Sequence, residues 1–284
     1  MKIGVSGAGG QLGQAVVQEL RRRIPDHEIV AITRAPEAVV GPVEGRFGDY
    51  DRPETLASAY TGLDRLLLIP SADLRPGVHA TQITAAIDAA VEANVGHIFL
   101  LSATGTRVRA EPAIGAGYWA GEHRLLRSDA KAWTILRMNF FAETFAEQGA
   151  MAAGIGHIPG FAENKVAFVS REDVAIACAG ALVSANHVGA IYNLSGPDRV
   201  SGAERAALLS KATGKPIVFQ VLTEEQLRGA MGQAGLPHFI VDAIVSMQEA
   251  QAEGAYDVVS GDLEKLAGRS PRSLQSVLSE KAPS

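Results

Sequence analysis

The chain has 284 residues, 47% of them hydrophobic, and a formal net charge of −5 at pH 7, which suits one large soluble α/β domain or one domain with an added lobe. The acidic balance argues against binding to nucleic acid, and no apolar run approaches the length of a membrane span. Met1-Lys2 leads straight into an apolar run, which leaves no room for a signal peptide. We therefore expect a cytoplasmic protein that binds neither nucleic acid nor membrane. A single cysteine and seven histidines without metal-ligand spacing argue against disulfides and a metal site, whereas homodimer formation is left open.

The beginning of the chain carries the clearest pattern. The apolar run 2–5 predicts a strand, and residues 14–23 predict a helix. Between them lies a G-x-x-G-x-x-G pattern, formed by Gly7, Gly10 and Gly13. Such a loop turns tightly, lets the backbone approach a pyrophosphate, and directs the N–H groups of a helix N-terminus at it. A dinucleotide-binding domain is therefore predicted, rather than a glycine-rich turn that binds nothing.

The second predicted strand, 29–32, indicates which dinucleotide is bound. An acidic residue at its end would hydrogen-bond the ribose 2′-hydroxyl of NAD, but this chain has Thr33 and Arg34 there. A guanidinium matches a 2′-phosphate in charge and in bidentate geometry. We therefore expect NADP(H) as the cofactor, unless Arg34 is simply a solvated loop charge.

Strands and helices continue to alternate, which predicts a Rossmann-type doubly wound parallel sheet. We assign 1–150 to this core and 151–284 to a smaller, mostly helical C-terminal lobe that packs into the same globule and contributes strands to the core. The further strands are expected at 66–69, 97–101, 133–137, 166–169 and 191–194, and the further helices at 81–93, 119–127, 201–213, 223–232, 238–253 and from Pro271. Ser170 is expected to cap a helix in which Cys178 is a packed core thiol.

Ligands of such sheets bind beyond the carboxyl ends of the strands. Besides the glycine loop and Arg34, those ends carry Asp49-Tyr50, Pro70-Ser71 and Ser102. Residues 104–117 form a long loop with Gly and Pro, which we interpret as a substrate lid.

The usual catalytic pair of glycine-loop reductases, Tyr-x-x-x-Lys, is missing. The nearest match runs from Tyr118 to Glu122, and a carboxylate would raise rather than lower the pKa of a neighbouring phenol. A quinone or a cationic conjugated dye accepts hydride without such a pair, provided that two flat rings are held at reacting distance. The walls of that pocket are expected to be Tyr118, Trp119, Phe140 and Phe141, although both phenylalanines could instead pack in the core.

Several segments together resemble the NmrA-like atypical short-chain dehydrogenase/reductases, in particular the type 2 quinone oxidoreductases and the triphenylmethane reductases. The resemblance covers nearly the whole chain and is carried by 6–13, 29–34, 48–51, 66–71, 136–137 with 140–143, 191–196, 223–226 and 235–237. The family often has His-x-x-Thr-Glu where this chain has Tyr118 to Glu122, and Arg-Asn-Gly where it has Arg137-Met138-Asn139.

The resemblance implies that NADPH lies over the glycine loop, with Arg34 near the adenosine phosphate and the nicotinamide beyond Ser102. The cofactor-binding residues are then expected to be Gly7, Gly10, Gln11, Leu12, Gly13, Thr33, Arg34, Asp49, Tyr50, Pro70, Ser71 and Ser102. Tyr118 and Ser102 are the catalytic candidates. The predicted function is NADPH-dependent reduction of a quinone or similar small conjugated acceptor. The alternatives are a redox-sensing regulator that binds NADP(H) without turnover, or reduction of enones, imines or dyes.

Overall fold

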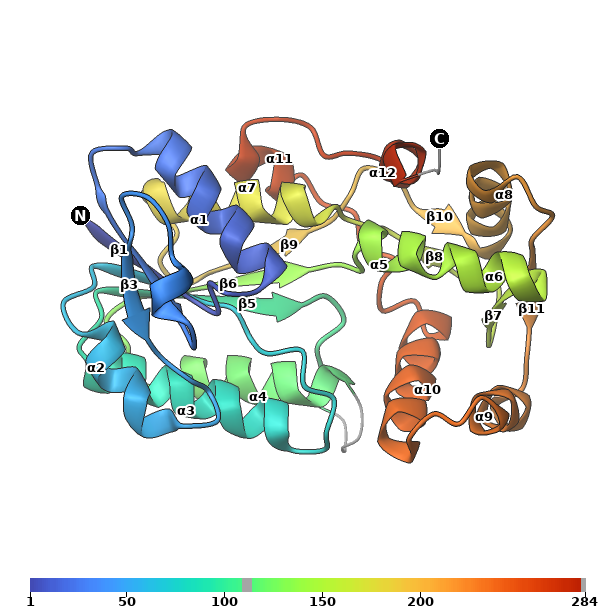
Figure 1. Ribbon diagram of the computed structural model, residues 1–284, viewed down its shortest axis with the longest axis horizontal. Helices are drawn as coiled ribbons and strands as arrows, with labels where there is room; N and C mark the ends of the chain where they lie inside the picture. Colours follow the sequence, from blue (N-terminus) through green and yellow to red (C-terminus); the bar gives the residue numbers. More distant parts are fainter. Residues whose placement is uncertain (109–113, 282–284) are drawn as a thin grey trace.

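A computed structural model describes residues 1–108 and 114–281 and confirms the doubly wound sheet (Figure 1). Seven parallel strands lie in the order β3-β2-β1-β4-β5-β6-β9. Their bounds are Lys2–Ser6 (β1), Glu28–Thr33 (β2), Glu44–Phe47 (β3), Arg65–Leu68 (β4), His97–Ala103 (β5), Trp133–Met138 (β6) and Ala190–Leu194 (β9). The chain reverses its winding direction between β1 and β4, which places the ligand crevice at the carboxyl ends of these strands.

Helices cover both faces of the sheet because its strands are apolar on both faces. Along β4, Leu66 and Leu68 pack against one helical layer and Leu67 against the other. One layer consists of α1 (Gln11–Arg23), α7 (Arg171–Val183) and α11 (Asp262–Ala267), and the other of α2 (Leu56–Tyr60), α3 (Val78–Glu92) and α4 (Ile114–Leu126) (Figure 1).

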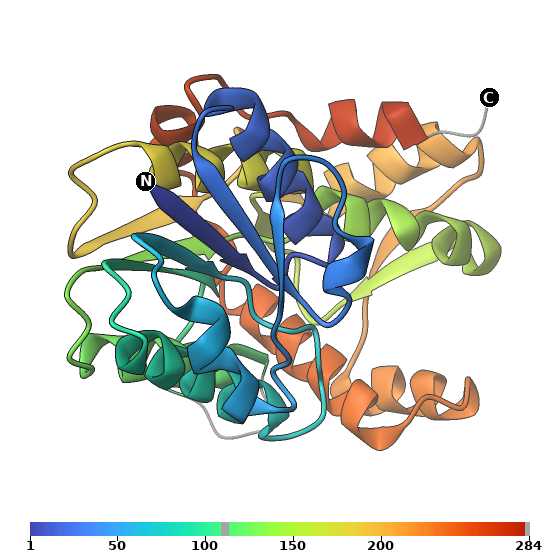
Figure 2. The same cartoon turned by 60° about the vertical axis from the view of Figure 1, so that its left-hand side comes forward.

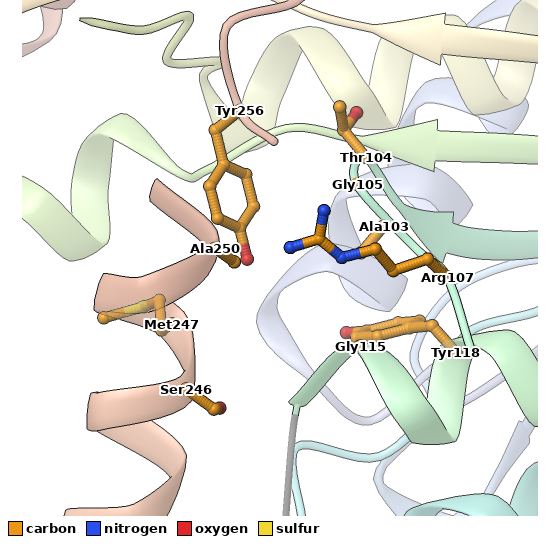
Figure 3. A pocket seen from close by; sticks show the side chains of 10 residues that line it. All are labelled: Ala103, Thr104, Gly105, Arg107, Gly115, Tyr118, Ser246, Met247, Ala250 and Tyr256. Atoms are coloured by element: carbon orange, nitrogen blue, oxygen red, sulfur yellow. The ribbon is translucent and has the colours of Figure 1, made fainter. Parts of the chain in front are cut away.

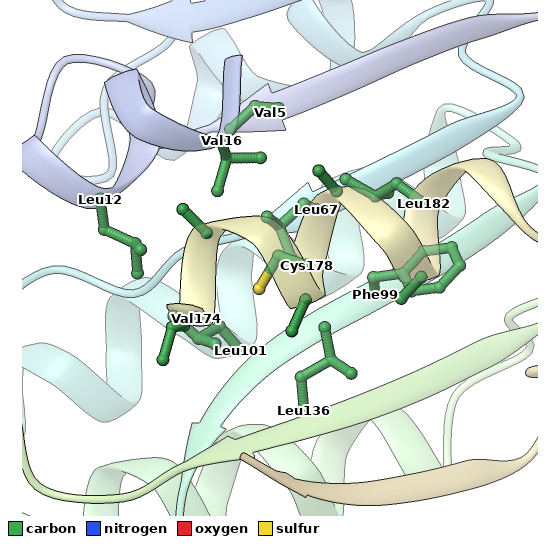
Figure 4. Close-up of a cluster of buried hydrophobic side chains, with 14 of the residues drawn as sticks. Val5, Leu12, Val16, Leu67, Phe99, Leu101, Leu136, Val174, Cys178 and Leu182 are labelled. Carbon is green, nitrogen blue, oxygen red and sulfur yellow. The ribbon is translucent and has the colours of Figure 1, made fainter. Parts of the chain in front are cut away.

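Cys178 lies in the first of these layers, with no exposed surface, among aliphatic side chains of α1 and the sheet (Figure 4). Burial raises the pKa of its thiol to about 12. Ser170 caps α7 by accepting a hydrogen bond from the Asp173 N–H. The expected capped helix with a packed, unreactive thiol is therefore confirmed.

The C-terminal lobe lies beside the sheet and carries its own apolar clusters (Figure 2). Its helices are α5 (Ala142–Glu147), α6 (Gly149–Ile155), α8 (Gly202–Thr213), α9 (Glu224–Gln233), α10 (His238–Ala252) and α12 (Leu274–Lys281). It also contains two small sheets, which pair β7 (His157–Gly160) with β11 (Val218–Val221) and β8 (Lys165–Val166) with β10 (Val200–Ser201). After residue 150 the chain returns to the main sheet through α7, β9 and α11; the boundary at 150 stays a prediction.

The structure corrects several expected elements. The strand β3, the helix α11 and the two small sheets were not predicted; short 3₁₀ turns also occupy Pro36–Ala38 and Pro53–Thr55. Of the strand expected at 166–169, only Val166 belongs to a strand, β8. Val169 forms a single isolated bridge with Phe141. The first helix begins at Gln11, and the last begins at Leu274 instead of Pro271. The expected lid at 104–117 overlaps α4, which begins at Ile114, and its residues 109–113 lie outside the described chain.

Candidate functional site

The glycine loop joins β1 to α1 at the carboxyl edge of the sheet. Gly7 has φ +84°, a conformation that favours glycine, and both its N–H and that of Ala8 donate to the Ile32 carbonyl, which ties the loop to β2. A Cβ at Gly13 would lie 2.3 Å from the Gly7 carbonyl oxygen, so the absence of a side chain lets α1 approach the loop. These two glycines therefore shape the backbone itself.

Gly10 has a different role. Its φ of −77° and ψ of 162° are available to any residue, and a Cβ there would meet only the Gly7 carbonyl oxygen, at 3.6 Å. It is the N-cap of α1 and, having no side chain, leaves the first N–H groups of that helix without a side-chain acceptor. Open space above a helix N-terminus suits the pyrophosphate of a dinucleotide.

Gln11 and Leu12 contribute differently from one another to this loop. The Gln11 side chain is exposed beside the open space, whereas the Leu12 side chain is buried in the core beneath it. Only the backbone of Leu12 can therefore face a phosphate.

Arg34 follows β2 directly and is exposed. Among the described residues, no carboxylate pairs with it. Thr33 turns the chain here by accepting a hydrogen bond from the Ala35 N–H, at 3.3 Å, and lies against Gly9 of the glycine loop. A solvent-facing guanidinium next to the phosphate loop fits the 2′-phosphate of NADP(H).

The loops after β3 and β4 are held together by side chains that were expected to touch the adenosine. The Tyr50 hydroxyl donates to the Ile69 carbonyl at 3.0 Å, and burial raises the pKa of this phenol above its usual range. The Ser71 hydroxyl donates to Gln82, whose amide donates to Asp51 at 2.7 Å. Tyr50 and Ser71 thus support these loops, and their role towards the cofactor stays a prediction, as do those of Pro70 and Asp49, which accepts from the Asp51 N–H.

Ser102 is part of a buried polar cluster rather than of an open surface. Ser102 and Arg137 are register partners on β5 and β6, and Glu122 of α4 lies over both. The Glu122 carboxylate accepts from the Ser102 hydroxyl at 2.6 Å and from the Arg137 guanidinium through two bonds of 2.8 and 2.6 Å. Since its proton is donated to Glu122, the Ser102 hydroxyl has no proton to offer to an acceptor.

Tyr118 lines a pocket between the end of β5 and helix α10 (Figure 3). Burial, and secondarily the nearby Tyr256, raise the pKa of Tyr118 to about 12, so the phenol is protonated at neutral pH. Its high pKa was expected, but from Glu122, whose carboxylate instead pairs with Arg137. The lining residues are Ala103, Thr104, Gly105, Arg107, Gly115, Tyr118, Ser246, Met247, Ala250 and Tyr256.

The other three expected wall residues lie elsewhere. Trp119 stacks on His123, with ring centroids 5.5 Å apart. Phe140 packs edge-on against Phe168 and Tyr256, and Phe141 lies under the guanidinium of Arg171. Both phenylalanines are partly buried against apolar clusters and are not among the lining residues of this pocket, and their contact with an acceptor stays a prediction.

The pocket residues that the sequence did not indicate come from distant segments. Met247 and Tyr256 reach it because α10 and the loop after it fold back over β5, and no local pattern signals such a contact. His79 of α3 contacts the Tyr118 ring, with centroids 4.6 Å apart; neither of its ring nitrogens has a hydrogen-bond partner in the described chain. Burial lowers its pKa to about 4, so the imidazole is neutral at pH 7.

Two kinds of feature are absent from the described residues. None of the helices combines the length and the apolar character that crossing a bilayer takes. The same residues contain no group of three or more His, Cys, Asp or Glu side chains that could hold a metal ion.

The fold and the site together define an NADP(H)-binding oxidoreductase, with a glycine loop after β1, an exposed arginine after β2 and a pocket at the carboxyl end of β5. Residues 7–185 match the family model described as NAD(P)H-binding. The chain belongs to this family, within the NmrA-like atypical short-chain dehydrogenase/reductases.

Known proteins resemble the chain over almost its full length. Quinone oxidoreductase 2 of Escherichia coli is 31% identical over 94% of this chain and 93% of its own. NAD(P)H azoreductase of Xenophilus azovorans is also 31% identical, again over 94% and 93%. The triphenylmethane reductase of a Citrobacter species, solved with NADP(H), superimposes with a TM-score of 0.86 at 29% identity and covers 100% of both chains.

Proposed function

We propose that the chain reduces quinones or similarly conjugated acceptors with NADPH, in the pocket lined by Tyr118. The observation that carries this proposal is the pocket itself, which has aromatic and apolar walls at the carboxyl end of β5, two strands from the glycine loop, and no lysine among its described lining residues. Conjugated acceptors need no such pair, because reduction makes a quinone ring aromatic and hydride addition neutralises the charge of a cationic dye. The three relatives, which are named as a quinone, an azo and a triphenylmethane reductase, support the same acceptor class.

The residues of the site divide the work between binding and orientation. The backbone from Gly7 to Gly13 and the N-terminus of α1 hold the pyrophosphate, and Arg34 pairs with the 2′-phosphate. When bound, NADPH supplies the hydride, which together with one proton from water converts a quinone to its hydroquinone. Tyr118, Met247 and Tyr256 hold the flat acceptor against the nicotinamide face and exclude water from it.

The test is a mixture of purified protein, NADPH and a simple quinone, followed through the absorbance of the reduced nicotinamide. We expect enzyme-dependent loss of this absorbance with one hydroquinone formed for each NADPH oxidised. Binding of NADPH without turnover on quinone, azo and triphenylmethane acceptors would contradict the proposal and favour the redox-sensing regulator.

Replacement of Arg34 by Ala should weaken NADPH binding about ten- to a hundredfold, because a charged hydrogen bond contributes roughly 1.5–3 kcal/mol. NADH, which lacks the 2′-phosphate, should bind the variant as it binds the wild type. Fluorescence titration with both cofactors measures this difference. Equal losses for NADPH and NADH would show that Arg34 does not read the 2′-phosphate.

Replacement of Tyr118 by Phe should lower kcat/KM on a quinone by only about tenfold, in keeping with one lost hydrogen bond. With a pKa of about 12 the phenol stays protonated through neutral pH, and the apolar ring face remains in the variant. The pH profiles of the two proteins between pH 6 and pH 9 should therefore have the same shape. A loss of a thousandfold or more, together with loss of a titrating group, would identify Tyr118 as the proton donor.

The homodimer and the cytoplasmic location stay predictions of the sequence. Light scattering on the purified chain determines the first, and fractionation of cells that express it determines the second.

A further inference from the structure

The pocket at the end of β5 contains one charged side chain among its described lining residues, and that side chain is cationic. Arg107 follows β5 and extends towards α10, with Tyr256 on one side of its guanidinium and Tyr118 on the other (Figure 3). Burial raises the pKa of both phenols, so neither supplies a balancing negative charge at neutral pH. The inner wall of the pocket is therefore positively charged next to two aromatic rings.

Arg107 is paired with Glu253, the residue at the end of α10. The two side chains are 40% and 45% exposed, and ion pairs with this much solvent contact are weak and easily exchanged. A guanidinium has five N–H donors in a planar fork, so one carboxylate leaves donors for a second oxyanion. Glu253 is not among the lining residues, so it offsets part of the positive charge of Arg107 without occupying the pocket that a ligand enters.

We propose that the acceptor is a planar conjugated molecule that carries an oxyanion group, a carboxylate, sulfonate or phosphate, and that Arg107 binds this group. The inference rests on the proposed function and adds to it the charge of the substrate. Arg107 determines specificity here and takes no part in the hydride transfer. A cationic triphenylmethane dye, by contrast, would bring a like charge against the guanidinium, so this chain should discriminate against such dyes.

The experiment compares kcat/KM for a neutral naphthoquinone and for the same ring carrying a sulfonate, in the wild type and in Arg107→Gln. The quantity to compare is the ratio of kcat/KM for the sulfonated quinone to kcat/KM for the neutral quinone. Because both proteins are measured on the same two acceptors, the different reactivities of the acceptors cancel when the ratio of the variant is divided by that of the wild type. We expect the ratio to fall by about ten- to a hundredfold in Arg107→Gln, the loss typical of one charged hydrogen bond. Arg107→Lys should keep part of the preference, and Glu253→Gln should increase it, because the guanidinium is then released from its carboxylate.

The matched control is Arg124→Gln. Arg124 lies on α4 and pairs with Asp88, and the two side chains are 42% and 51% exposed. The Arg124→Gln variant therefore loses an ion pair about as exposed as that of Arg107, but at a residue that does not line the pocket. Its selectivity ratio should equal that of the wild type. In the same series, Arg107→Gln should improve turnover of a cationic triphenylmethane dye relative to the neutral quinone.

The possible failures are distinguishable. An unchanged sulfonate-to-neutral ratio in Arg107→Gln overturns the assignment of Arg107 while quinone reduction stands. A loss of NADPH affinity in Arg107→Gln, measured without acceptor and as large as the expected loss of selectivity, would show that Arg107 serves the cofactor. That result would also overturn the assignment of Arg107. If neither quinone oxidises NADPH in the wild type, the proposed function has failed.

Discussion

Gly10→Val should abolish NADPH binding, with at least a hundredfold loss of affinity, and leave the protein folded. The backbone at Gly10 has dihedral angles that valine adopts freely, and the Cβ itself meets nothing closer than 3.6 Å. The two methyl groups of valine would instead extend into the open space above the N-terminus of α1, which the pyrophosphate needs. The substitution therefore removes the ligand's place without disturbing the chain.

The matched control is Gly13→Ala, one turn further along the helix. A Cβ there would lie 2.3 Å from the Gly7 carbonyl oxygen and 2.7 Å from the Ala8 Cα, so α1 has to move away from β1. This variant should lose stability in urea unfolding, whereas Gly10→Val should unfold like the wild type. NADPH titration and circular dichroism on both proteins separate the two effects. Retained NADPH affinity in a folded Gly10→Val protein would refute the phosphate-loop assignment.

The contrast between these glycines also shows why the geometry of the glycine loop could be predicted from the sequence, whereas its contacts with the cofactor stay a prediction. The loop and the arginine after β2 lie within one β-α-β unit, where short-range rules fix which residues meet. The strand β3 was missed because Glu44 to Phe47 form an exposed, polar edge of the sheet without the apolar run that marks its inner strands.

The acceptor side could not be predicted in the same way. Arg107, Met247 and Tyr256 meet only because α10 returns over the sheet edge, a tertiary contact that no local period encodes. Tyr118, to which the spacing drew attention, does line the pocket, and its contact with the acceptor stays a prediction. Spacing along the chain did not predict the role of Glu122, which stands where the lysine was sought. Its carboxylate pairs with Arg137, which lies on the strand β6 and not on the same helix.

The ion pair of Arg137 with Glu122 leads to the second prediction with a large effect. Arg137→Leu should cost about 3–5 kcal/mol of unfolding free energy, because it leaves the Glu122 carboxylate, which is 1% exposed, without its cation. Replacing both residues with leucine should recover much of the loss, since the uncompensated charge is then gone. Urea unfolding of the wild type, the two single variants and the double variant gives the coupling energy directly. Additive losses in this cycle would mean that the ion pair does not act as a unit.

The same cycle has a functional readout. Glu122 and Tyr118 lie one turn apart on α4, and the carboxylate fixes this helix to the ends of β5 and β6. Where Arg137→Leu is still folded, α4 loses its attachment to β6 and keeps only the hydrogen bond to Ser102. We then expect KM for a quinone to rise more than kcat falls, because the Tyr118 wall is displaced while the glycine loop is untouched. NADPH affinity should accordingly be retained in this variant. A parallel loss of NADPH binding would show that the ion pair supports the whole sheet edge rather than the pocket wall.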